Sequence, residues 1–292
     1  MTARLGRWLF TPIPLARFAA FRTLVYAFIF IDVVFMSGPA RSRAAVSPDL
    51  YVPLTIARVL PFPTPTHAVV TATFWALLVL APIAAFGRRP RLLGAAVFVL
   101  YLEWMLIAMS YGKVDHDRLG ILVALALLPT VGRARHGDPT ESEAAGWVFR
   151  MVQLAVIATY FLAACAKMRF GGIGWLWGGT LGWAIERRGT MWSNWLLQLP
   201  LVLVFVPIGM VAFEALSPLI FFVKESAQRK IVVGFYVFHV ITIMALKISF
   251  APHLIAMTSF LPLERVTPIR WVQAAVRRPV ADAPLPVAQT QT

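Results

Sequence analysis

Residues 147–170 read WVFRMVQLAVIATYFLAACAKMRF, an almost wholly apolar run that is long enough to cross a bilayer as one helix. Its polar exceptions are ordered, because Gln153, Tyr160 and Lys167 follow one another at intervals of seven residues. Seven residues are close to two helical turns, so the three side chains form one polar stripe on an apolar helix. Such a stripe faces protein or water and not lipid. The segment therefore predicts a membrane helix packed inside a bundle.

The rest of the chain also has the composition of a membrane protein. Of its 292 residues, 59% are hydrophobic and only 14% are charged, whereas a soluble domain carries about a quarter charged residues. A net charge of +14 would suggest nucleic acid in a soluble chain, but in an apolar chain it is typical of cationic loops at a membrane surface. No nucleic-acid partner is expected. Cys165 is the single cysteine, which excludes an intrachain disulfide and cysteine-based zinc binding, and no metal is predicted.

Eight segments approach the length of about 20 apolar residues that a membrane helix needs. They are residues 16–37, 66–86, 92–111, 115–131, 147–167, 195–222, 231–250 and 252–263. The expected fold class is therefore an all-α integral membrane protein, built as a bundle of about eight transmembrane helices. The first apolar run is longer than a signal-peptide core and lacks a small-residue cleavage site, so we expect it to be retained.

The distribution of basic residues predicts the orientation and the domain limits. If both termini lie in the cytoplasm, the connections on the cytoplasmic side carry more Lys and Arg residues than those on the outer side. This excess favours a topology with both termini inside, in the bacterial inner (plasma) membrane. Two outer connections, residues 38–65 and 170–194, are apolar and rich in proline or tryptophan, as interfacial or re-entrant segments are. Residues 1–265 form the predicted membrane domain. Residues 266–292 are rich in proline and alanine and predict a disordered cytoplasmic tail.

Ionisable side chains inside membrane helices are costly to insert, so each is a functional candidate. The candidates are Arg22, Asp32, Glu103, Arg150, Lys167, Glu214, His239 and Lys247. For Arg22, Asp32 and Arg150 we favour mutual neutralisation inside the bundle. His239 is either a hydrogen-bonded interior histidine or part of a cavity. Lys167 is either a lysine that reaches the head groups or a desolvated amine that can act as a base.

A second polar cluster precedes the fourth predicted helix, on the same outer side as Lys167. Residues 110–118 read SYGKVDHDR and place Asp115, His116 and Asp117 at the mouth of the bundle. An imidazole and two carboxylates can transfer protons. An aspartate here can equally serve only to cap the following helix, and both interpretations stay open.

The order of these motifs resembles the HTTM (horizontally transferred transmembrane) domain family, a membrane domain shared with vitamin K-dependent gamma-glutamyl carboxylase. The resemblance covers most of residues 10–262. It is carried by PLARFAAFR (14–22), His116, the set Gln153, Tyr160, Phe161, Ala163 and Lys167 followed by Trp175 and Gly178, and FYVFH ending at His239.

The resemblance implies that Lys167 is a base that deprotonates a reduced quinone of the vitamin K or menaquinol type, with His116 as a second catalytic residue. It implies quinol-linked redox or carboxylation-type chemistry at the outer membrane face, in a carboxylase-like or epoxidase-like enzyme. The residues expected to line the pocket are Gln153, Tyr160, Asp115, Asp117, His239 and Trp175.

The sequence also departs from the carboxylase pattern. Ala166 stands where the carboxylase has the first of two lysines, and Trp175 follows Lys167 at a greater distance. The large lumenal region of the carboxylase is expected to be absent. Two other functions therefore stay open. One is a non-catalytic maturation or export factor for a secreted peptide, of the sporulation-delaying protein B type, with a secreted or periplasmic partner. The other is a transporter whose intramembrane polar residues line a substrate path.

Overall fold

The computed structural model describes residues 2–60, 62–177 and 179–266. The predicted tail, apart from Val266, lies outside these residues. The N-terminal half contains α1 (Thr2–Leu9), β1 (Ile13–Pro14), α2 (Leu15–Ile31), η1 (Asp32–Met36), α3 (Gly38–Ser42), η2 (Arg43–Ala45), η3 (Pro48–Leu50), α4 (Thr55–Val59), α5 (His67–Ala85), α6 (Pro90–Met109), η4 (His116–Arg118) and α7 (Leu119–Val131).

The second half begins at β2, the short strand that pairs with β1. Its elements are β2 (Glu141–Ser142), α8 (Glu143–Ala166), η5 (Lys167–Gly171), α9 (Gly174–Trp177), α10 (Thr180–Arg188), η6 (Asn194–Gln198), α11 (Pro200–Ala215), η7 (Ser217–Phe222), α12 (Glu225–Leu246), α13 (Ala251–Met257), η8 (Thr258–Phe260) and η9 (Leu263–Arg265). The prediction of an all-α protein is confirmed.

Five helices of the described part are long and apolar enough to cross a membrane. They are Leu15–Met36, His67–Ala85, Pro90–Met109, Glu143–Gly171 and Glu225–Leu246. The other three predicted spans are helical but shorter, because α7 has 13 residues, α11 has 16 and α13 has 7. At 1.5 Å per residue, α7 is about 20 Å long, which is less than the thickness of about 30 Å of the hydrocarbon core.

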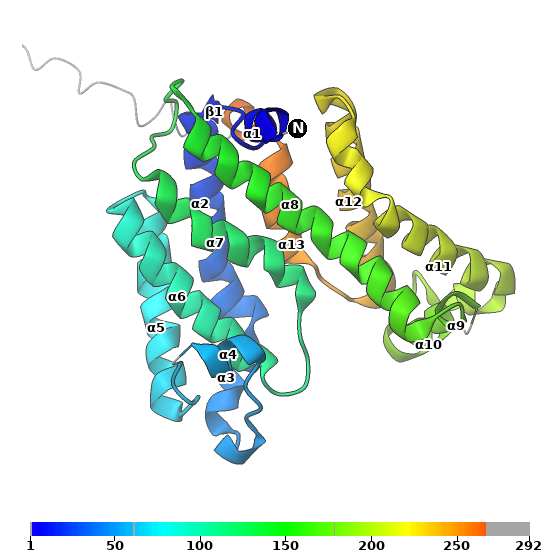
Figure 1. The fold of residues 1–292 in the computed structure, drawn as a ribbon. Coiled ribbons are helices and arrows are strands. Elements are labelled where there is room, and N and C mark those ends of the chain that lie inside the picture. The colour runs from blue at the N-terminus through cyan, green and yellow to red at the C-terminus, as the bar shows by residue number, and fades with distance from the viewer. Residues whose placement is uncertain (1, 61, 178, 267–292) are drawn as a thin grey trace, which may run out of the picture.

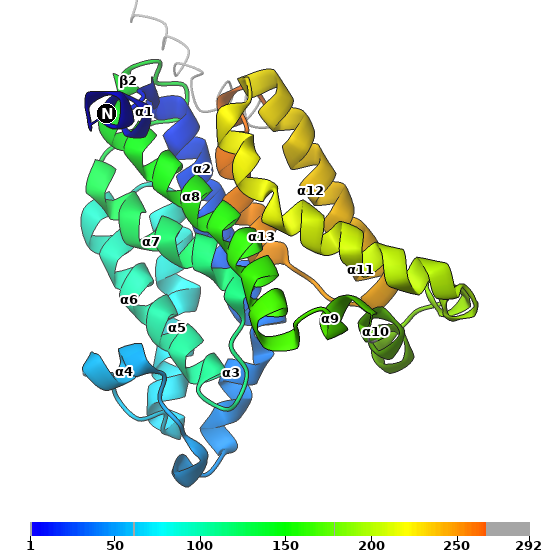
Figure 2. The ribbon, with the colours of Figure 1, turned by 45° about the vertical axis from the view of Figure 1, so that its right-hand side comes forward.

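Helices α2, α5, α6, α7 and α8 pack into one bundle (Figure 1). Helix α13 lies against α7, α8 and α2, while α9 to α12 form a second group that joins the bundle mainly through α8 and α11 (Figure 2). Large apolar and aromatic side chains fill the bundle, among them Trp104, Tyr26 and Phe21. Apolar side chains also face outward, as Val233 and Ile241 of α12 do. Exposed apolar residues along long helices are expected where the solvent is lipid.

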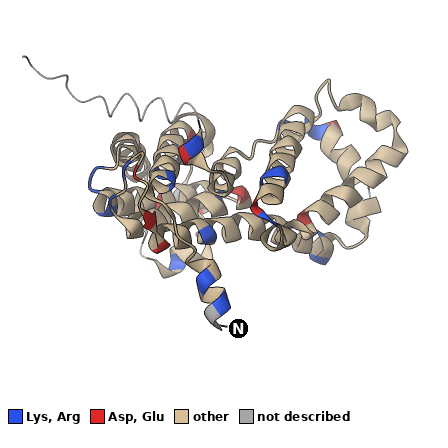
Figure 3. Cartoon of the chain, turned by 90° about the horizontal axis from the view of Figure 1, so that it is seen from above, with Lys and Arg blue, Asp and Glu red and all other residues tan. Residues whose placement is uncertain are grey.

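The N-terminal end of the bundle is held together by contacts between distant segments. Ile13 pairs with Ser142 and Pro14 with Glu141, which joins the start of α2 to the start of α8. At the same end, Arg17 forms an ion pair with Glu264 at 2.9 Å. Figure 3, a view from above, shows lysine and arginine residues on α1 and at helix ends.

Arg22, a buried arginine of α2, lies at the N-terminal end of the bundle beneath the loop that follows α7. Arg22 is 3% exposed, and its Nη1 donates to the carbonyl oxygen of Ala134 at 3.2 Å. Thr23 Oγ1 donates to the carbonyl oxygen of Ala85, so it can accept from His136 Nε2 at 3.0 Å. Burial lowers the pKa of the His136 imidazole, and the Arg22 guanidinium lowers it further. His136 is therefore neutral near pH 7.

The two connections that the sequence predicts to be outer form short helices, away from the N-terminal end of the bundle. Residues 38–60 contain α3, η2, η3 and α4, and residues 174–198 contain α9, α10 and η6. Trp177, Trp183 and Trp192 of the second connection are exposed. Exposed indoles on short helices suit the boundary between membrane and water.

Replacing Gly146 by alanine is expected to lower the free energy of unfolding by about 1–3 kcal/mol, which is the usual cost of overpacking. A Cβ at this position in α8 would overlap the carbonyl oxygen of Thr11, so the strand pairing at the N-terminal end would have to shift. Gly234→Ala in α12 is the control, because a Cβ there meets open space. Thermal unfolding in detergent checks both variants, and equal midpoints would contradict the prediction.

Candidate functional site

The polar stripe of α8 meets side chains from four other segments along its length. Tyr160 lies near the C-terminal end of α8, and Lys167, two turns further on, begins η5; together they contact α9, α11, α12 and α13. We call Lys167, Glu214, Tyr160, His239 and His253 the outer polar cluster, after the side of the membrane that the sequence predicts for Lys167. The sequence predicted three of these residues for the site; Glu214 was only a general intramembrane candidate, and His253 was missed.

Lys167 forms an ion pair with Glu214 of α11. Its Nζ lies 2.6 Å from Oε1 and also contacts Oε2, and it stands over the Trp175 ring at 5.3 Å from the centroid. Glu214 is 6% exposed, and the Lys167 side chain is 21% exposed. The ammonium group is therefore held by a carboxylate and an aromatic face, and does not extend freely toward the head groups.

Tyr160 lies two helical turns before Lys167 and contacts two histidines. Its hydroxyl lies 2.6 Å from Nε2 of His239 on α12. Its ring stacks on Phe235 at 4.3 Å and meets the edge of the His253 ring at 4.7 Å. The two imidazole rings are 5.7 Å apart between centroids. Helices α8, α12 and α13 thus bring a phenol and two imidazoles into direct contact.

Several nitrogen atoms of these histidines have no hydrogen-bond partner among the described residues. They are His239 Nδ1 and both ring nitrogens of His253. Both imidazoles are only 2% exposed. A buried N–H group without an acceptor costs about 1–3 kcal/mol, so such groups need an explanation. The arrangement leaves donor and acceptor capacity for a polar ligand atom within the membrane domain.

His116 is separated from the outer polar cluster by one aromatic ring, that of Phe250. Its side chain is exposed, and its ring lies 6.5 Å from Phe250, which in turn lies 4.7 Å from His239. Asp115 forms an exposed ion pair with Lys113 at 2.6 Å. Asp115 occupies the position before η4 but makes no capping hydrogen bond, so its capping role is wrong. Asp117 is half-buried, and among the described residues it forms no hydrogen bond or ion pair with Lys167.

Gln153 lies on the predicted face but far from Lys167. Fourteen residues of helix separate them, which is about 20 Å along the axis. Its amide oxygen accepts from Arg150 Nη1 at 2.9 Å, and its amide nitrogen donates to the carbonyl oxygen of Ser259 at 2.9 Å. Gln153 therefore connects α8 to η8, and its predicted place in the pocket beside Lys167 has no contact to support it.

Asp32 is neutralised inside the bundle as predicted, but not by the expected residues. Its carboxylate accepts from Nη1 of Arg118 at 2.8 Å and from the Tyr101 hydroxyl at 3.0 Å. Arg22 and Arg150 instead donate to a carbonyl and an amide oxygen, so the prediction of acid partners for them is wrong. The spacing of Asp32 and Arg118 contained no signal, because they are 86 residues apart.

Two surface hollows lie away from the outer polar cluster. One of about 420 Å³ includes Arg89, Arg91 and Arg133, and one of about 610 Å³ includes Arg43 and Tyr111. Among the described residues, no three His, Cys, Asp or Glu side chains are placed to hold a metal ion. Comparison with models of protein families, with curated proteins and with solved structures finds no match to this chain.

Proposed function

We propose that this chain is a multi-pass inner-membrane protein of the HTTM type that removes a proton from a membrane-dissolved quinol and starts its oxidation. Eight membrane-embedded helices, with both termini inside, would place the outer polar cluster near the outer leaflet. The observation that carries the proposal is the Lys167–Glu214 ion pair, two helical turns from a phenol and two imidazoles with unused hydrogen-bonding capacity.

The ion pair can supply a base without leaving an unpaired charged group inside the membrane. When the shared proton lies on Glu214, the amine of Lys167 is neutral and can accept the phenolic proton of the quinol. The resulting ammonium then neutralises the phenolate, and Trp175 lies against the same cation. His239 and His253 would hydrogen-bond the second ring oxygen of the quinol. With dioxygen as the oxidant, one quinol and one dioxygen give one quinone epoxide and one water.

Lys167→Arg is the sharpest variant for this proposal. Arginine can keep the ion pair with Glu214, but a guanidinium does not give up its proton in proteins. We expect menaquinol or vitamin K hydroquinone turnover to fall by about a hundredfold or more, the usual worth of a positioned base, with little change in the unfolding midpoint.

The assay uses the purified full chain and measures the quinone and the epoxide that it forms by chromatography. Lys230→Ala, an exposed lysine near the other end of α12, is the matched control and should turn over like the wild type. Wild-type turnover in Lys167→Arg would remove the base assignment.

No turnover by the wild-type chain would overturn the enzymatic proposal. Counterflow of labelled solute in proteoliposomes would then favour a transporter, and co-purification of a secreted peptide would favour a maturation or export factor. Both alternatives use intramembrane polar residues without quinol chemistry.

A further inference from the structure

Arginines gather on two neighbouring segments at the N-terminal end of the bundle, away from the outer polar cluster. One segment is the turn between α5 and α6, and the other is the loop that follows α7. The five arginines are all exposed: Arg88, Arg89, Arg91, Arg133 and Arg135. Buried Arg22 lies beneath them, where its guanidinium contacts Ala134 and Gly87.

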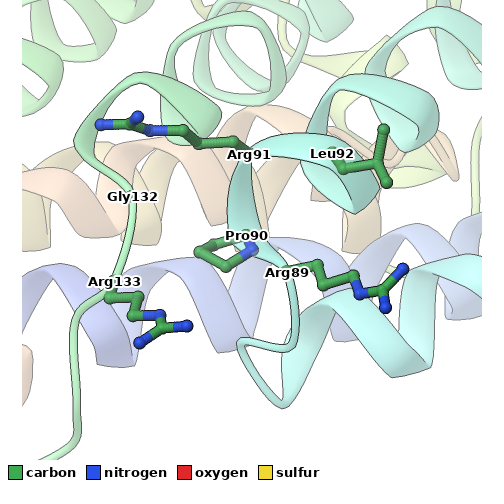
Figure 4. Close-up of a pocket in the computed structure, with 6 residues that line it drawn as sticks. All are labelled: Arg89, Pro90, Arg91, Leu92, Gly132 and Arg133. Atoms are coloured by element: carbon green, nitrogen blue, oxygen red, sulfur yellow. The ribbon is translucent and has the colours of Figure 1, made fainter.

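The two segments border an open surface hollow of about 420 Å³, which is large enough for a small polar ligand. Arg89, Pro90, Arg91, Leu92, Gly132 and Arg133 line it. Figure 4 shows Arg91 extending from the start of α6 toward Gly132, and Arg133 reaching from the facing loop toward Pro90, while Arg89 extends on the other side of the turn. Two arginines from different segments thus border one space.

The backbone at the hollow is left-handed at two positions and runs close to Arg91. Gly132 is buried at φ +80°, and the position of a Cβ there would be 3.4 Å from Arg91 Nε. Arg89 has φ +38°, a left-handed conformation that is unusual for a residue other than glycine, asparagine or aspartate.

The positive charge of the hollow is not neutralised by the described part of the protein. Arg89, Arg91 and Arg133 form none of its ion pairs, whereas Arg17, Arg118, Arg229 and Arg265 all contact carboxylates. The acid in the same loop is Asp138, which lies beside Arg135 and accepts a hydrogen bond from the Thr140 amide. A site of this charge selects an anion.

The border of the hollow is apolar, which argues for an amphiphile. Leu92 lines it and is 63% exposed, and Phe86 of the same turn is 85% exposed. A free phosphate would have no use for these side chains, whereas the acyl chains of a lipid would cover them. Basic pockets between membrane helices bind the head groups of anionic lipids. We propose that Arg91 and Arg133, with Arg89 at the rim of the hollow, bind the phosphodiester head group of an anionic phospholipid in the leaflet on the side of the N-terminus.

The test compares the purified full chain with the Arg89→Gln, Arg91→Gln, Arg133→Gln triple variant. Binding of phosphatidylglycerol and of phosphatidylcholine is measured in detergent by native mass spectrometry. We expect the triple variant to bind phosphatidylglycerol about a hundredfold more weakly, because a basic residue near an anionic surface contributes about fivefold. The matched control, Arg187→Gln with Arg188→Gln, removes exposed charge from α10 and should bind like the wild type.

The proposal would be overturned by equal binding of phosphatidylglycerol to the triple variant and the wild type, by an equal loss in the control, or by equal binding of phosphatidylcholine. Competition with inorganic phosphate at millimolar concentration shows whether the site binds a lipid head group or free phosphate. If phosphate displaces the lipid completely, the site is one for free phosphate and the lipid assignment fails. Unchanged unfolding midpoints in the triple variant show that a loss of binding does not come from unfolding.

Discussion

Asp32→Ala is expected to lower the free energy of unfolding by about 3–5 kcal/mol, the cost of removing one partner from a buried ion pair. The Asp32 side chain is fully buried and that of Arg118 is 10% exposed, so the guanidinium would stay in the bundle without a counter-charge. The Tyr101 hydroxyl would lose the same acceptor. Unfolding of the purified protein in detergent, followed by circular dichroism, measures the loss.

The control and the double variant make this prediction specific. Glu225→Ala breaks an exposed ion pair with Arg229 and should cost less than about 1 kcal/mol. Asp32→Leu combined with Arg118→Met should recover most of the stability, because replacing both charges by apolar groups removes the desolvation cost. A loss in Asp32→Ala no larger than that in Glu225→Ala would show that the buried pair does not support the bundle.

Glu214→Gln is expected to reduce quinol turnover by about a hundredfold or more, because glutamine cannot exchange a proton with Lys167 and no longer holds the amine in the position that the ion pair fixes. The loss of stability should be smaller than in Asp32→Ala, since the Lys167 side chain is 21% exposed and water can partly solvate its ammonium. The assay is the quinol turnover of the wild-type chain, with unfolding measured on the same samples.

Glu103→Gln is the matched control for Glu214→Gln. Glu103 is also a buried membrane carboxyl group, but it accepts only from the Thr73 hydroxyl at 3.4 Å and forms none of the described ion pairs. Its variant should keep full turnover. If Glu214→Gln turned over as fast as Glu103→Gln, the Lys167–Glu214 pair would have no part in proton transfer.

The sequence predicted the helices well, because their signal is local. Each of the eight predicted segments is largely helical, and the stripe of Gln153, Tyr160 and Lys167 lies on one helix, as its spacing required. Apolar length and seven-residue spacing are properties of a single helix, so no knowledge of its neighbours was needed. The same signal overstated the length of α11 and α13, since apolar residues in the adjoining turns extended the predicted spans, while the predicted span at α7 included the polar residues 115–118 that precede the helix.

The candidate site was predicted only in part, because its contacts join distant segments. Lys167 and Glu214 are 47 residues apart, and Tyr160 and His239 are 79 apart. His253 gave no signal, since a lone histidine at the start of a short apolar segment is as often a core residue as a site residue. Gln153 was predicted to line the same pocket as Lys167, and this was an error of the opposite kind. Two residues on one helix face can still lie far apart along the helix axis.

By itself, the sequence determined that this chain is helical, apolar and suited to a membrane, and which ionisable side chains lie within its helices. Only the tertiary structure decided which of them pair: Asp32 with Arg118, Lys167 with Glu214, and Tyr160 with His239. The physical reason is that a buried charge must find a partner, but several bases are available to each acid. A helix that rotates by one residue turns its side chains by about 100°, so the packing of the helices selects the partner.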